Sequence, residues 1–192
     1  MKVLAINGSH RKGSTLELLK IVLDEIDSSI EKEIASLSDY EIGYCKLCGA
    51  CKKNGGTCIL KDGFQELAEK MTAADIIVVG SPVYFGSITG KLKSLFDRSR
   101  ALRVSWSLKN KFCGALAVGA TIHGGQEHTI QAIHSWALIH GMLVFGDTSP
   151  TAHFGCAAVA SQKDGKFEFN KGGIETAKSL GRHINEIAEM LK

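Results

Sequence analysis

Short apolar runs alternate along the chain with longer amphipathic stretches. The apolar runs are rich in Val, Ile, Leu and Ala and are bounded by polar or glycine residues, which predicts buried strands. The longer stretches repeat apolar residues at spacings of three and four, as Leu16, Leu19 and Leu23 do, which predicts helices. The predicted strands are Lys2–Ile6, Ile34–Leu37, Asp75–Val79, Phe112–Val118 and Met142–Phe145. The predicted helices are Ser14–Ile30, 63–73, 89–101, 126–140 and 173–190.

This alternation of strands and helices indicates a parallel α/β sheet. Five strands with interleaved helices predict a flavodoxin-like, doubly wound five-stranded parallel sheet of order 2-1-3-4-5, with helices on both faces. The chain contains no internal repeat, low-complexity tract or linker. Residues 1–192 are therefore expected to form a single domain, into which a cysteine-rich loop at residues 43–59 is inserted.

Composition and charge narrow the class of protein. The 192 residues are 44% hydrophobic and 22% charged, which is typical of a soluble globular domain. The net charge of +3 is small and the basic residues are scattered, so nothing indicates a nucleic-acid partner. No apolar run reaches the length of a membrane span, and the N-terminal MKVLAINGS turns polar too early for a signal peptide. We therefore expect a cytoplasmic protein without a membrane partner.

The loop after the first strand, residues 7–15 (NGSHRKGST), has the features of a phosphate cradle. Gly8 and Gly13 have the spacing of a Walker motif, but Ser14 stands where the Walker lysine should be, which argues against an NTPase. Glycine backbone amides, three hydroxyl groups and Arg11 lie at a predicted helix N-terminus, which favours an anion. The alternative is a plain strand-to-helix turn in which Ser14 is the N-cap.

Two more glycine-containing loops follow the third and fourth predicted strands. They are residues 81–90 (SPVYFGSITG) and residues 119–128 (GATIHGGQEH). The carboxyl ends of neighbouring parallel strands share one edge of the sheet, so these loops and the first should meet one ligand. Tyr84 and Phe85 offer flat apolar surface, although core packing is their alternative role. A mononucleotide with a large ring is expected, and the absence of a G-x-G-x-x-G motif argues against an NAD-type site.

These motifs carry a family resemblance. GSHRKGST, SPVYFGSITGKLKSLFDR and the GGQE of residues 124–127 resemble the NADPH-dependent FMN reductase superfamily; with the cysteine-rich loop, the chain is similar to its archaeal-type iron–sulfur flavoproteins. The resemblance implies an FMN cofactor whose phosphate is held by Ser9, Arg11, Gly13, Ser14 and Thr15. It also places the ribityl chain and isoalloxazine ring against Pro82, Val83, Tyr84, Phe85, Gly86 and Ser87, and against Gly119, Ala120, Thr121, Gly124 and Gly125.

Four of the six cysteines lie close together in the sequence. Cys45, Cys48, Cys51 and Cys58 form a C-x2-C-x2-C-x6-C pattern, and three cysteines at such spacing wrap a [4Fe–4S] cluster in ferredoxins. Zinc usually takes two C-x2-C pairs that lie further apart, and disulfides are rare in a reducing compartment. The pattern therefore favours a [4Fe–4S] cluster, as the family resemblance also does. Bound zinc and free redox thiols remain alternatives.

The remaining cysteines and histidines give weaker signals. Cys113 and Cys156 are expected to be small buried hydrophobic residues. His128, His134 and His140 are six residues apart on one predicted helix and should point in different directions, which argues against a shared ligand. His123 in the fourth loop is placed either to touch the flavin or to face solvent. No catalytic side chain is expected, because the flavin carries the chemistry.

Two functions are consistent with these features. The first is electron transfer from a one-electron donor such as ferredoxin, through a cluster to FMN, and on to a quinone, oxygen or peroxide, the acceptors that the family suggests. The alternative is an NAD(P)H-dependent FMN or quinone reductase whose cysteine loop holds zinc or free thiols. A homodimer or homotetramer is expected, with the segment Thr148–Asn170, which lacks a helical period and carries Phe154, Phe167 and Phe169, at the subunit interface.

Overall fold

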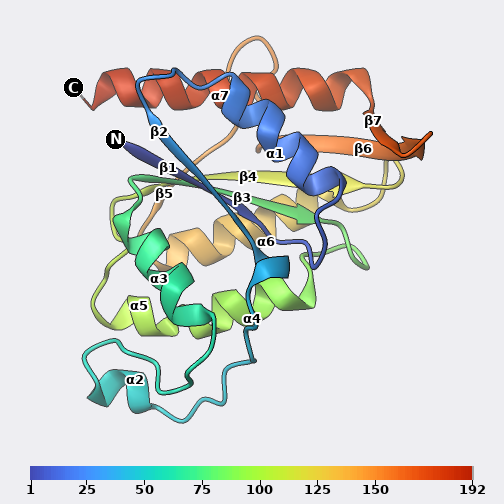
Figure 1. The fold of residues 1–192 in the computed structure, drawn as a ribbon. Helices are drawn as coiled ribbons and strands as arrows, with labels where there is room; N and C mark the ends of the chain where they lie inside the picture. The colour runs from blue at the N-terminus through green and yellow to red at the C-terminus, as the bar shows by residue number, and fades with distance from the viewer. Residues whose placement is uncertain (192) are drawn as a thin grey trace.

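A mostly parallel sheet forms the centre of the structure, a computed structural model that describes residues 1–191 (Figure 1). Four strands lie in the order β2-β1-β3-β4 and run parallel to one another. They are β1 (Lys2–Asn7), β2 (Glu31–Ser36), β3 (Ile76–Pro82) and β4 (Phe112–Gly119). The inner strands are almost wholly buried because helices cover both faces of the sheet. The flavodoxin-like α/β fold predicted from the alternation is confirmed.

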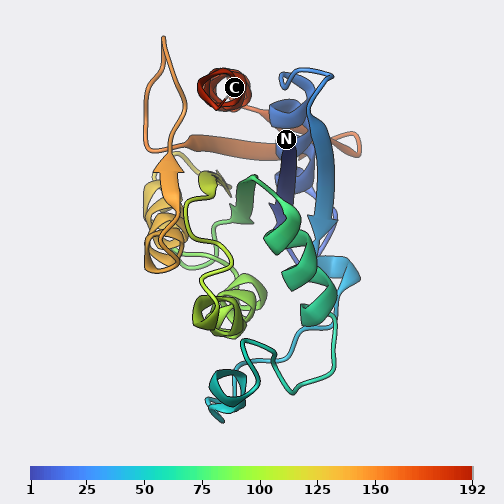
Figure 2. The same ribbon diagram turned by 90° about the vertical axis from the view of Figure 1, so that its left-hand side faces the viewer.

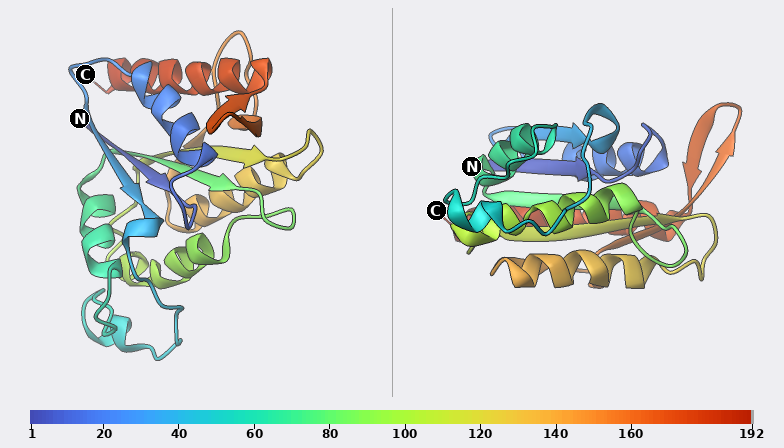
Figure 3. Two further views of the ribbon diagram at one scale, coloured as in Figure 1. Left: turned by 45° about the vertical axis from the view of Figure 1, so that its right-hand side comes forward. Right: turned by 90° about the horizontal axis from the view of Figure 1, so that it is seen from below.

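The fifth position of the sheet is divided between two strands. β5 (Leu143–Phe145) pairs with the start of β4, and β6 (Cys156–Lys163) pairs with its end, both in parallel. β7 (Lys166–Phe169) then returns antiparallel to β6, and this hairpin projects from the body of the molecule (Figure 3). The predicted count of five strands is therefore wrong, since residues 1–191 form a sheet of seven strands. The hydrophobic pattern does not predict β6, because only its first half is apolar and it ends in exposed polar residues.

Two layers of helices enclose the sheet. α1 (Ser14–Asp24) and α7 (Lys171–Met190) pack on one face, against strand residues such as Val3 and Ile76. α3 (Phe64–Ala73), α4 (Gly90–Arg98) and α6 (Gln126–Ile139) pack on the other, against Leu4 and Ile77 (Figures 1 and 2). Successive strand residues point to opposite faces, which is why neighbours in sequence join different cores. None of the described helices is long and apolar enough to cross a membrane.

Three predicted boundaries differ from those in the structure. α1 ends at Asp24 rather than near residue 30, because Asp27 Oδ1 accepts the Ser29 backbone N–H at 2.8 Å and forms a turn. The predicted helix over 89–101 is divided into α4 and a short α5 (Arg100–Val104) beside Ser99, whose hydroxyl donates to the Phe96 carbonyl. β2 begins three residues before its predicted start, because an edge strand accommodates charged residues.

The carboxyl ends of β1, β3 and β4 lie at one edge of the sheet, and three loops leave from there. We name them the first loop (residues 7–15), the third loop (81–90) and the fourth loop (119–128). The chain after β2 takes a different course, through a short helix η1 (Leu37–Asp39) and then away from the sheet. The cysteine segment (residues 43–59), with its four-residue helix α2 (Ala50–Lys53), lies beyond α4 and α5 (Figures 1 and 2).

Candidate functional site

A buried asparagine at the end of β1 shapes the first loop. Asn7 Oδ1 accepts a hydrogen bond from the Ser9 backbone N–H at 3.2 Å, and Asn7 Nδ2 donates to the Arg11 carbonyl at 3.4 Å. Nδ2 also donates to Ser36 Oγ, at the end of β2, at 3.3 Å. Ser9 Oγ accepts the Arg11 backbone N–H at 3.2 Å. Buried groups therefore fix the loop backbone, while the Arg11 side chain remains exposed.

Gly8 joins the first loop to the third. Its N–H donates to the Gly80 carbonyl at 2.7 Å, and its own carbonyl accepts Thr89 Oγ1 at 2.6 Å. Thr89 Oγ1 also accepts the Leu92 backbone N–H and so caps α4. A Cβ at Gly8 would lie 2.7 Å from both the Gly80 carbonyl oxygen and Leu92 Cδ2. Only glycine fits there, and the two loops are held together at their roots.

The start of α1 lacks a side-chain cap. Gly13 is the N-cap, and no described side chain accepts a hydrogen bond from the cap or first turn. The interpretation of Ser14 as the N-cap is therefore wrong, since Ser14 is the first helical residue. An uncapped helix start leaves backbone donors and the positive end of the dipole available to an anion. Ser9 and Thr15 are buried beside it, and Ser14 is half-buried.

The third loop presents an aromatic side chain on a tight turn. The backbones of Tyr84 and Ser87 exchange hydrogen bonds of 2.9 and 3.1 Å, and the intervening Phe85 and Gly86 have φ of 48° and 77°. Two consecutive positive φ values are typical of a type I′ turn. Phe85 is fully exposed, and a bulky residue in this conformation is strained, which is common at ligand sites. Tyr84 Oη lies 3.2 Å from His10 Nδ1 on the first loop.

The fourth loop meets the third loop at a pair of glycines. A Cβ on Gly125, which has φ of 103°, would lie 2.8 Å from Gly86 Cα. Next to it, Gln126 is buried, and its Nε2 donates to the Thr121 carbonyl at 2.7 Å. Gln126 Oε1 is also buried but has no hydrogen-bond partner among the described residues. A buried acceptor without a partner calls for a donor from a bound molecule or a water.

The three loops together offer one composite surface. The first contributes backbone donors, hydroxyl groups and a positive charge, the third contributes aromatic surface, and the fourth contributes glycine backbone with an unpartnered acceptor beneath it. The first and third loops are linked through Gly8 and Thr89, and the third and fourth through Gly86 and Gly125. This combination suits a phosphorylated ligand with a planar ring.

The four cysteines of the cysteine segment line one small cavity. Cys51 lies on α2, while the others lie on irregular backbone in which Leu47 and Gly49 have positive φ. None of the cysteines forms a disulfide. Within residues 1–191, no three Cys, His, Asp or Glu side chains are grouped closely enough to hold a single metal ion. The cysteines that line the common cavity are Cys45, Cys48, Cys51 and Cys58.

A buried arginine connects the cysteine segment to the core. Arg98, on α4, binds the two carboxylate oxygens of Asp62 at 2.7 and 3.0 Å. It also donates to the carbonyls of Gly43 and Leu60 at 3.0 and 3.4 Å, which lie at either end of the segment. Burial alone would raise the pKa of Asp62, but the Arg98 guanidinium and the backbone N–H groups of Gly43 and Phe64 hold that pKa below its ordinary value.

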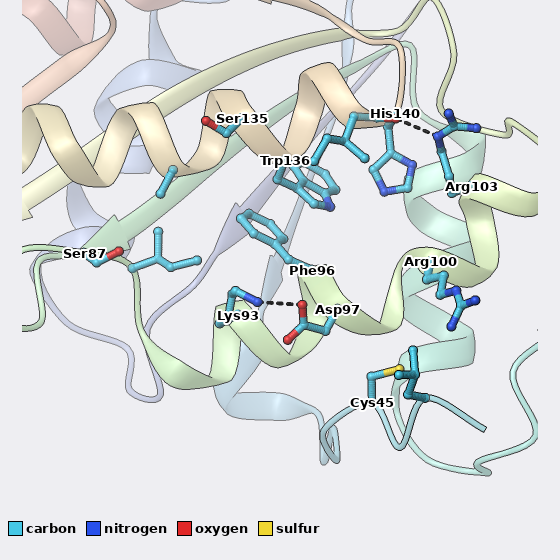
Figure 4. A pocket seen from close by; sticks show the side chains of 14 residues that line it. Cys45, Ser87, Lys93, Phe96, Asp97, Arg100, Arg103, Ser135, Trp136 and His140 are labelled. Carbon is cyan, nitrogen blue, oxygen red and sulfur yellow. Dashed lines mark hydrogen bonds and ion pairs between the residues drawn. The ribbon is translucent and has the colours of Figure 1, made fainter. Parts of the chain in front are cut away.

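A groove of about 680 Å³ lies between the cysteine segment and the third loop (Figure 4). Cys45 and Ser87 both line it, so it touches both candidate sites. Its apolar wall includes Phe96 of α4 and Trp136 of α6, whose rings stack with centroids 4.2 Å apart. The two sites are therefore built from separate backbone but share a continuous surface.

Comparison with known families shows which family the chain belongs to. The model of the NADPH-dependent FMN reductase family matches residues 1–155. The chain belongs to the NADPH-dependent FMN reductase family. It is therefore an FMN-dependent oxidoreductase, as the motifs in the three loops predict.

Several relatives of this chain match it over its whole length. An iron–sulfur flavoprotein of Methanocaldococcus jannaschii is 45% identical over 194 residues and covers 100% of both chains. An iron–sulfur flavoprotein of Methanosarcina thermophila is 46% identical over 195 residues, covering 100% of this chain and 97% of its own. The solved structure of a WrbA-like flavodoxin from Agrobacterium tumefaciens has a TM-score of 0.66 at 20% identity, covering 100% and 99% of the two chains, and shows the shared fold.

The residues present fit FMN, the cofactor of this reductase family. The uncapped start of α1 suits its phosphate, and the exposed Phe85 turn and the unpartnered Gln126 Oε1 suit its ring and ribityl chain. The individual contacts stay predictions. All of the predicted flavin residues lie on the three loops: Ser9, Arg11, Gly13, Ser14, Thr15, Pro82, Val83, Tyr84, Phe85, Gly86, Ser87, Gly119, Ala120, Thr121, Gly124 and Gly125.

Sequence reasoning missed the residues that support these loops. Asn7, Thr89 and Gln126 do not stand out as ligands, and their buried hydrogen bonds become visible only in the fold. Arg98 was also missed, because an arginine at the end of an amphipathic helix reads as solvent-exposed. A polar residue directly after a buried strand, as Asn7 is, was the available signal.

The predictions for the other cysteines and histidines are confirmed where the structure tests them. Cys113 and Cys156 are fully buried, and burial raises the pKa of each thiol to about 12, which makes both unreactive. Along α6, His128 is exposed, His134 is half-buried and His140 is buried, so they face different surroundings. The side chain of His123, on the fourth loop, is exposed.

Proposed function

We propose that the chain is an iron–sulfur flavoprotein that passes electrons from a one-electron donor such as ferredoxin, by way of a [4Fe–4S] cluster and FMN, to an acceptor such as a quinone, oxygen or peroxide. The observation that carries this proposal is the single cavity lined by Cys45, Cys48, Cys51 and Cys58. Four thiolates around one cavity are the ligand set of such a cluster. The names of the full-length relatives support it.

In this proposal the first loop holds the FMN phosphate. The backbone donors at the start of α1 bind the phosphate oxygens, and Arg11 offsets their charge from the solvent side. The loop backbone needs no rearrangement to do so, because Asn7 already fixes it. The phosphate ligands are Ser9, Arg11, Gly13, Ser14 and Thr15.

The third and fourth loops would carry the rest of the cofactor. The contact between Gly86 and Gly125 leaves no side chain between a ring and the loop backbone, so backbone amides are free to bond its polar edge. Gln126 Oε1 is placed to accept a hydrogen bond from a ribityl hydroxyl or the ring. FMN, when bound, supplies one- and two-electron chemistry, and the chain orients it and limits its access to water.

A second candidate function is an NAD(P)H-dependent FMN or quinone reductase in which the cysteine segment holds zinc or free thiols. The description of the matched family, NADPH-dependent FMN reductase, favours NADPH as the donor. Four cysteines are a common ligand set for structural zinc, although the side chains of the described residues would have to move closer together to hold a single ion.

Metal analysis of protein purified without oxygen separates the two functions. The proposed function predicts four iron and four sulfide per chain, together with a broad visible absorption that bleaches on reduction. The alternative predicts flavin absorption alone, with one zinc per chain or none. Zinc at one equivalent after reconstitution with iron and sulfide would contradict the proposed function.

We also propose that the chain forms a homodimer or homotetramer. Phe154 is 60% exposed, and Leu138 and Ile139 expose apolar surface at the end of α6. Phe167 on the β6–β7 hairpin is instead half-buried within its own chain. Its ring packs near Gly13, since its Cζ would lie 3.6 Å from a Cβ at that position. Sedimentation at micromolar concentration should give a dimer or tetramer, and a monomer would contradict this proposal.

A further inference from the structure

Arg98 occupies an unusual position between the core and the cysteine segment. Its side chain is only 1% exposed, and the Phe64 ring covers one face of the guanidinium, with Arg98 Cζ 4.7 Å from the ring centroid. Its two terminal nitrogens are fully used, by Asp62 and by the carbonyls of Gly43 and Leu60. These bonds already account for the attachment of the segment to α4.

The third nitrogen of the guanidinium has no such role. Arg98 Nε is buried and has no hydrogen-bond partner among the described residues. Arg98 lines the same cavity as the four cysteines. An unpaired buried donor, part of a full positive charge, is costly unless an acceptor completes it. The cavity itself is the place from which such an acceptor would come.

The charges around the cavity point the same way. Arg98 pairs with the Asp62 carboxylate, and it lines the same cavity as Cys58. Lys46, Lys52 and Lys53 on the segment are exposed and are solvated. Arg98 is thus a fully desolvated cation beside the thiols.

We propose that Arg98 is a positioning residue for the cluster, and that its Nε–H donates a hydrogen bond to a sulfur of the cluster or to Cys58 Sγ. This inference rests on the proposed function, because it assumes a cluster in the cavity. Hydrogen bonds to the sulfurs of an iron–sulfur cluster stabilise its more negative, reduced state and so raise the reduction potential. Arg98 then sets the potential at which the cluster accepts an electron, in addition to anchoring the segment.

Two substitutions separate this role from simple anchoring. Arg98→Lys keeps the positive charge but removes the Nε–H, and it also loses the paired bonds to Asp62. Asp62→Asn weakens the same paired bonds but leaves Arg98 and its Nε in place. If Arg98 only anchors the segment, both variants should disturb the cluster alike. If Nε donates to a sulfur, Arg98→Lys should lower the midpoint potential of the cluster well beyond any shift in Asp62→Asn.

The measurement is a redox titration of each reconstituted variant, with the cluster followed by its paramagnetic reduced signal and FMN followed by absorbance. Arg100→Lys is the matched control, because Arg100 lines the same cavity without joining the anchor. We expect the cluster potential to fall much further in Arg98→Lys than in Asp62→Asn and to stay unchanged in Arg100→Lys, and we expect the FMN potential to be unchanged in all three. Equal shifts in Arg98→Lys and Asp62→Asn, or no shift in either, would overturn the inference.

A measurement on the unaltered side chain keeps the inference testable if Arg98→Lys does not fold. In the Arg100→Lys protein labelled with ¹⁵N-arginine, the electron spin of the reduced cluster should couple to an arginine nitrogen. Absence of that coupling while the cluster signal is intact would overturn the role of Arg98 and leave the proposed function standing. Failure of the wild-type chain to assemble any iron–sulfur cluster would overturn both.

Discussion

The three flavin loops and the cysteine segment are attached to the core in different ways. The loops leave directly from buried strands, and hydrogen bonds between their roots, such as that from Gly8 N–H to the Gly80 carbonyl, fix them to the sheet. The cysteine segment is a long excursion with one short helix, and a few side chains tie its ends, chiefly buried Arg98, which pairs with Asp62, and Gln65, whose Nε2 donates to the Cys58 carbonyl. A site on strand ends is specified by the fold, whereas a site on an excursion depends on its own ligands and its anchor.

The largest expected effect is loss of the cluster from the cysteine segment while the flavin loops keep FMN. Cys58→Ala leaves three thiolates on the cavity, so iron should be lost or a damaged cluster should remain. FMN content should stay near one per chain, because the predicted flavin residues all lie outside the cysteine segment. Iron and flavin analysis of the purified variant checks both expectations.

Cys113→Ala is the control for that experiment. Cys113 is buried in β4 and lies away from the cavity, so this variant should keep both iron and FMN. Loss of FMN together with iron in Cys58→Ala would contradict the independence of the two sites.

Low pH should destabilise the protein through His140, which lines the groove between the two regions. Burial, with a smaller contribution from the Arg103 charge, lowers the pKa of His140 to about 4. As the pH falls, the unfolded chain therefore takes up this proton at a higher pH than the folded chain does. The contribution of neutral His140 to stability is full above about pH 6.5 and is lost as the pH falls through 4. The free energy of unfolding should drop by about 3 kcal/mol over this interval.

Denaturant unfolding at a series of pH values measures that loss. His140→Gln retains a hydrogen-bonding group for Ser99 Oγ, which lies 2.8 Å from His140 Nε2, but it does not titrate. Its stability should therefore depend less on pH between 6.5 and 4. The same slope in both proteins would show that His140 does not cause the effect.

A third change tests the root of the first loop. In Gly8→Ala the new Cβ would meet the Gly80 carbonyl oxygen and Leu92 at 2.7 Å, which should destabilise the fold by about 1–3 kcal/mol. FMN affinity should fall as the loop shifts, while cluster content should not change. Gly90→Ala is the matched control, because a Cβ there meets nothing within 4 Å. Equal stability of the two variants would contradict the packing argument.

The smallest expected effect concerns the phosphate. Arg11→Ala removes an exposed cation from the first loop and should weaken FMN binding by about 1.5 kcal/mol, roughly tenfold in Kd. Lys12→Ala removes the neighbouring charge, which pairs with Asp39 at 3.0 Å, and should leave the Kd nearly unchanged. Flavin titration of both variants checks this, and equal losses would indicate a general charge effect rather than a direct contact.

The fold could be predicted as far as the hydrophobic pattern reaches. β1, β3 and β4 are continuous apolar runs buried on both faces, and their loops carry glycine and hydroxyl residues, so both the strands and the flavin edge could be predicted. β2 and β6 were placed imprecisely or missed, because edge position and exposure allow charged and polar residues there.

The sequence predicts the candidate ligands of the two sites. It does not predict the residues whose hydrogen bonds hold those ligands in place. The spacing of the four cysteines and the glycines of the first loop are local signals. The bonds from Asn7 to Ser36 and from Arg98 to Asp62 join residues far apart in the sequence, and such pairs follow from the tertiary fold alone. The same holds for Gln126, whose unpartnered Oε1 depends on what surrounds it.

The most direct test of the account is the route of electrons in the intact protein. Reduced ferredoxin is mixed without oxygen with the wild-type chain and with Cys58→Ala, each loaded with FMN, and flavin reduction is followed by absorbance. The account predicts rapid flavin reduction in the wild type and a sharply slower reaction in Cys58→Ala, whereas any direct reduction by NADPH should be equal in the two. Equal rates with ferredoxin would contradict the claim that electrons reach FMN through the cysteine segment.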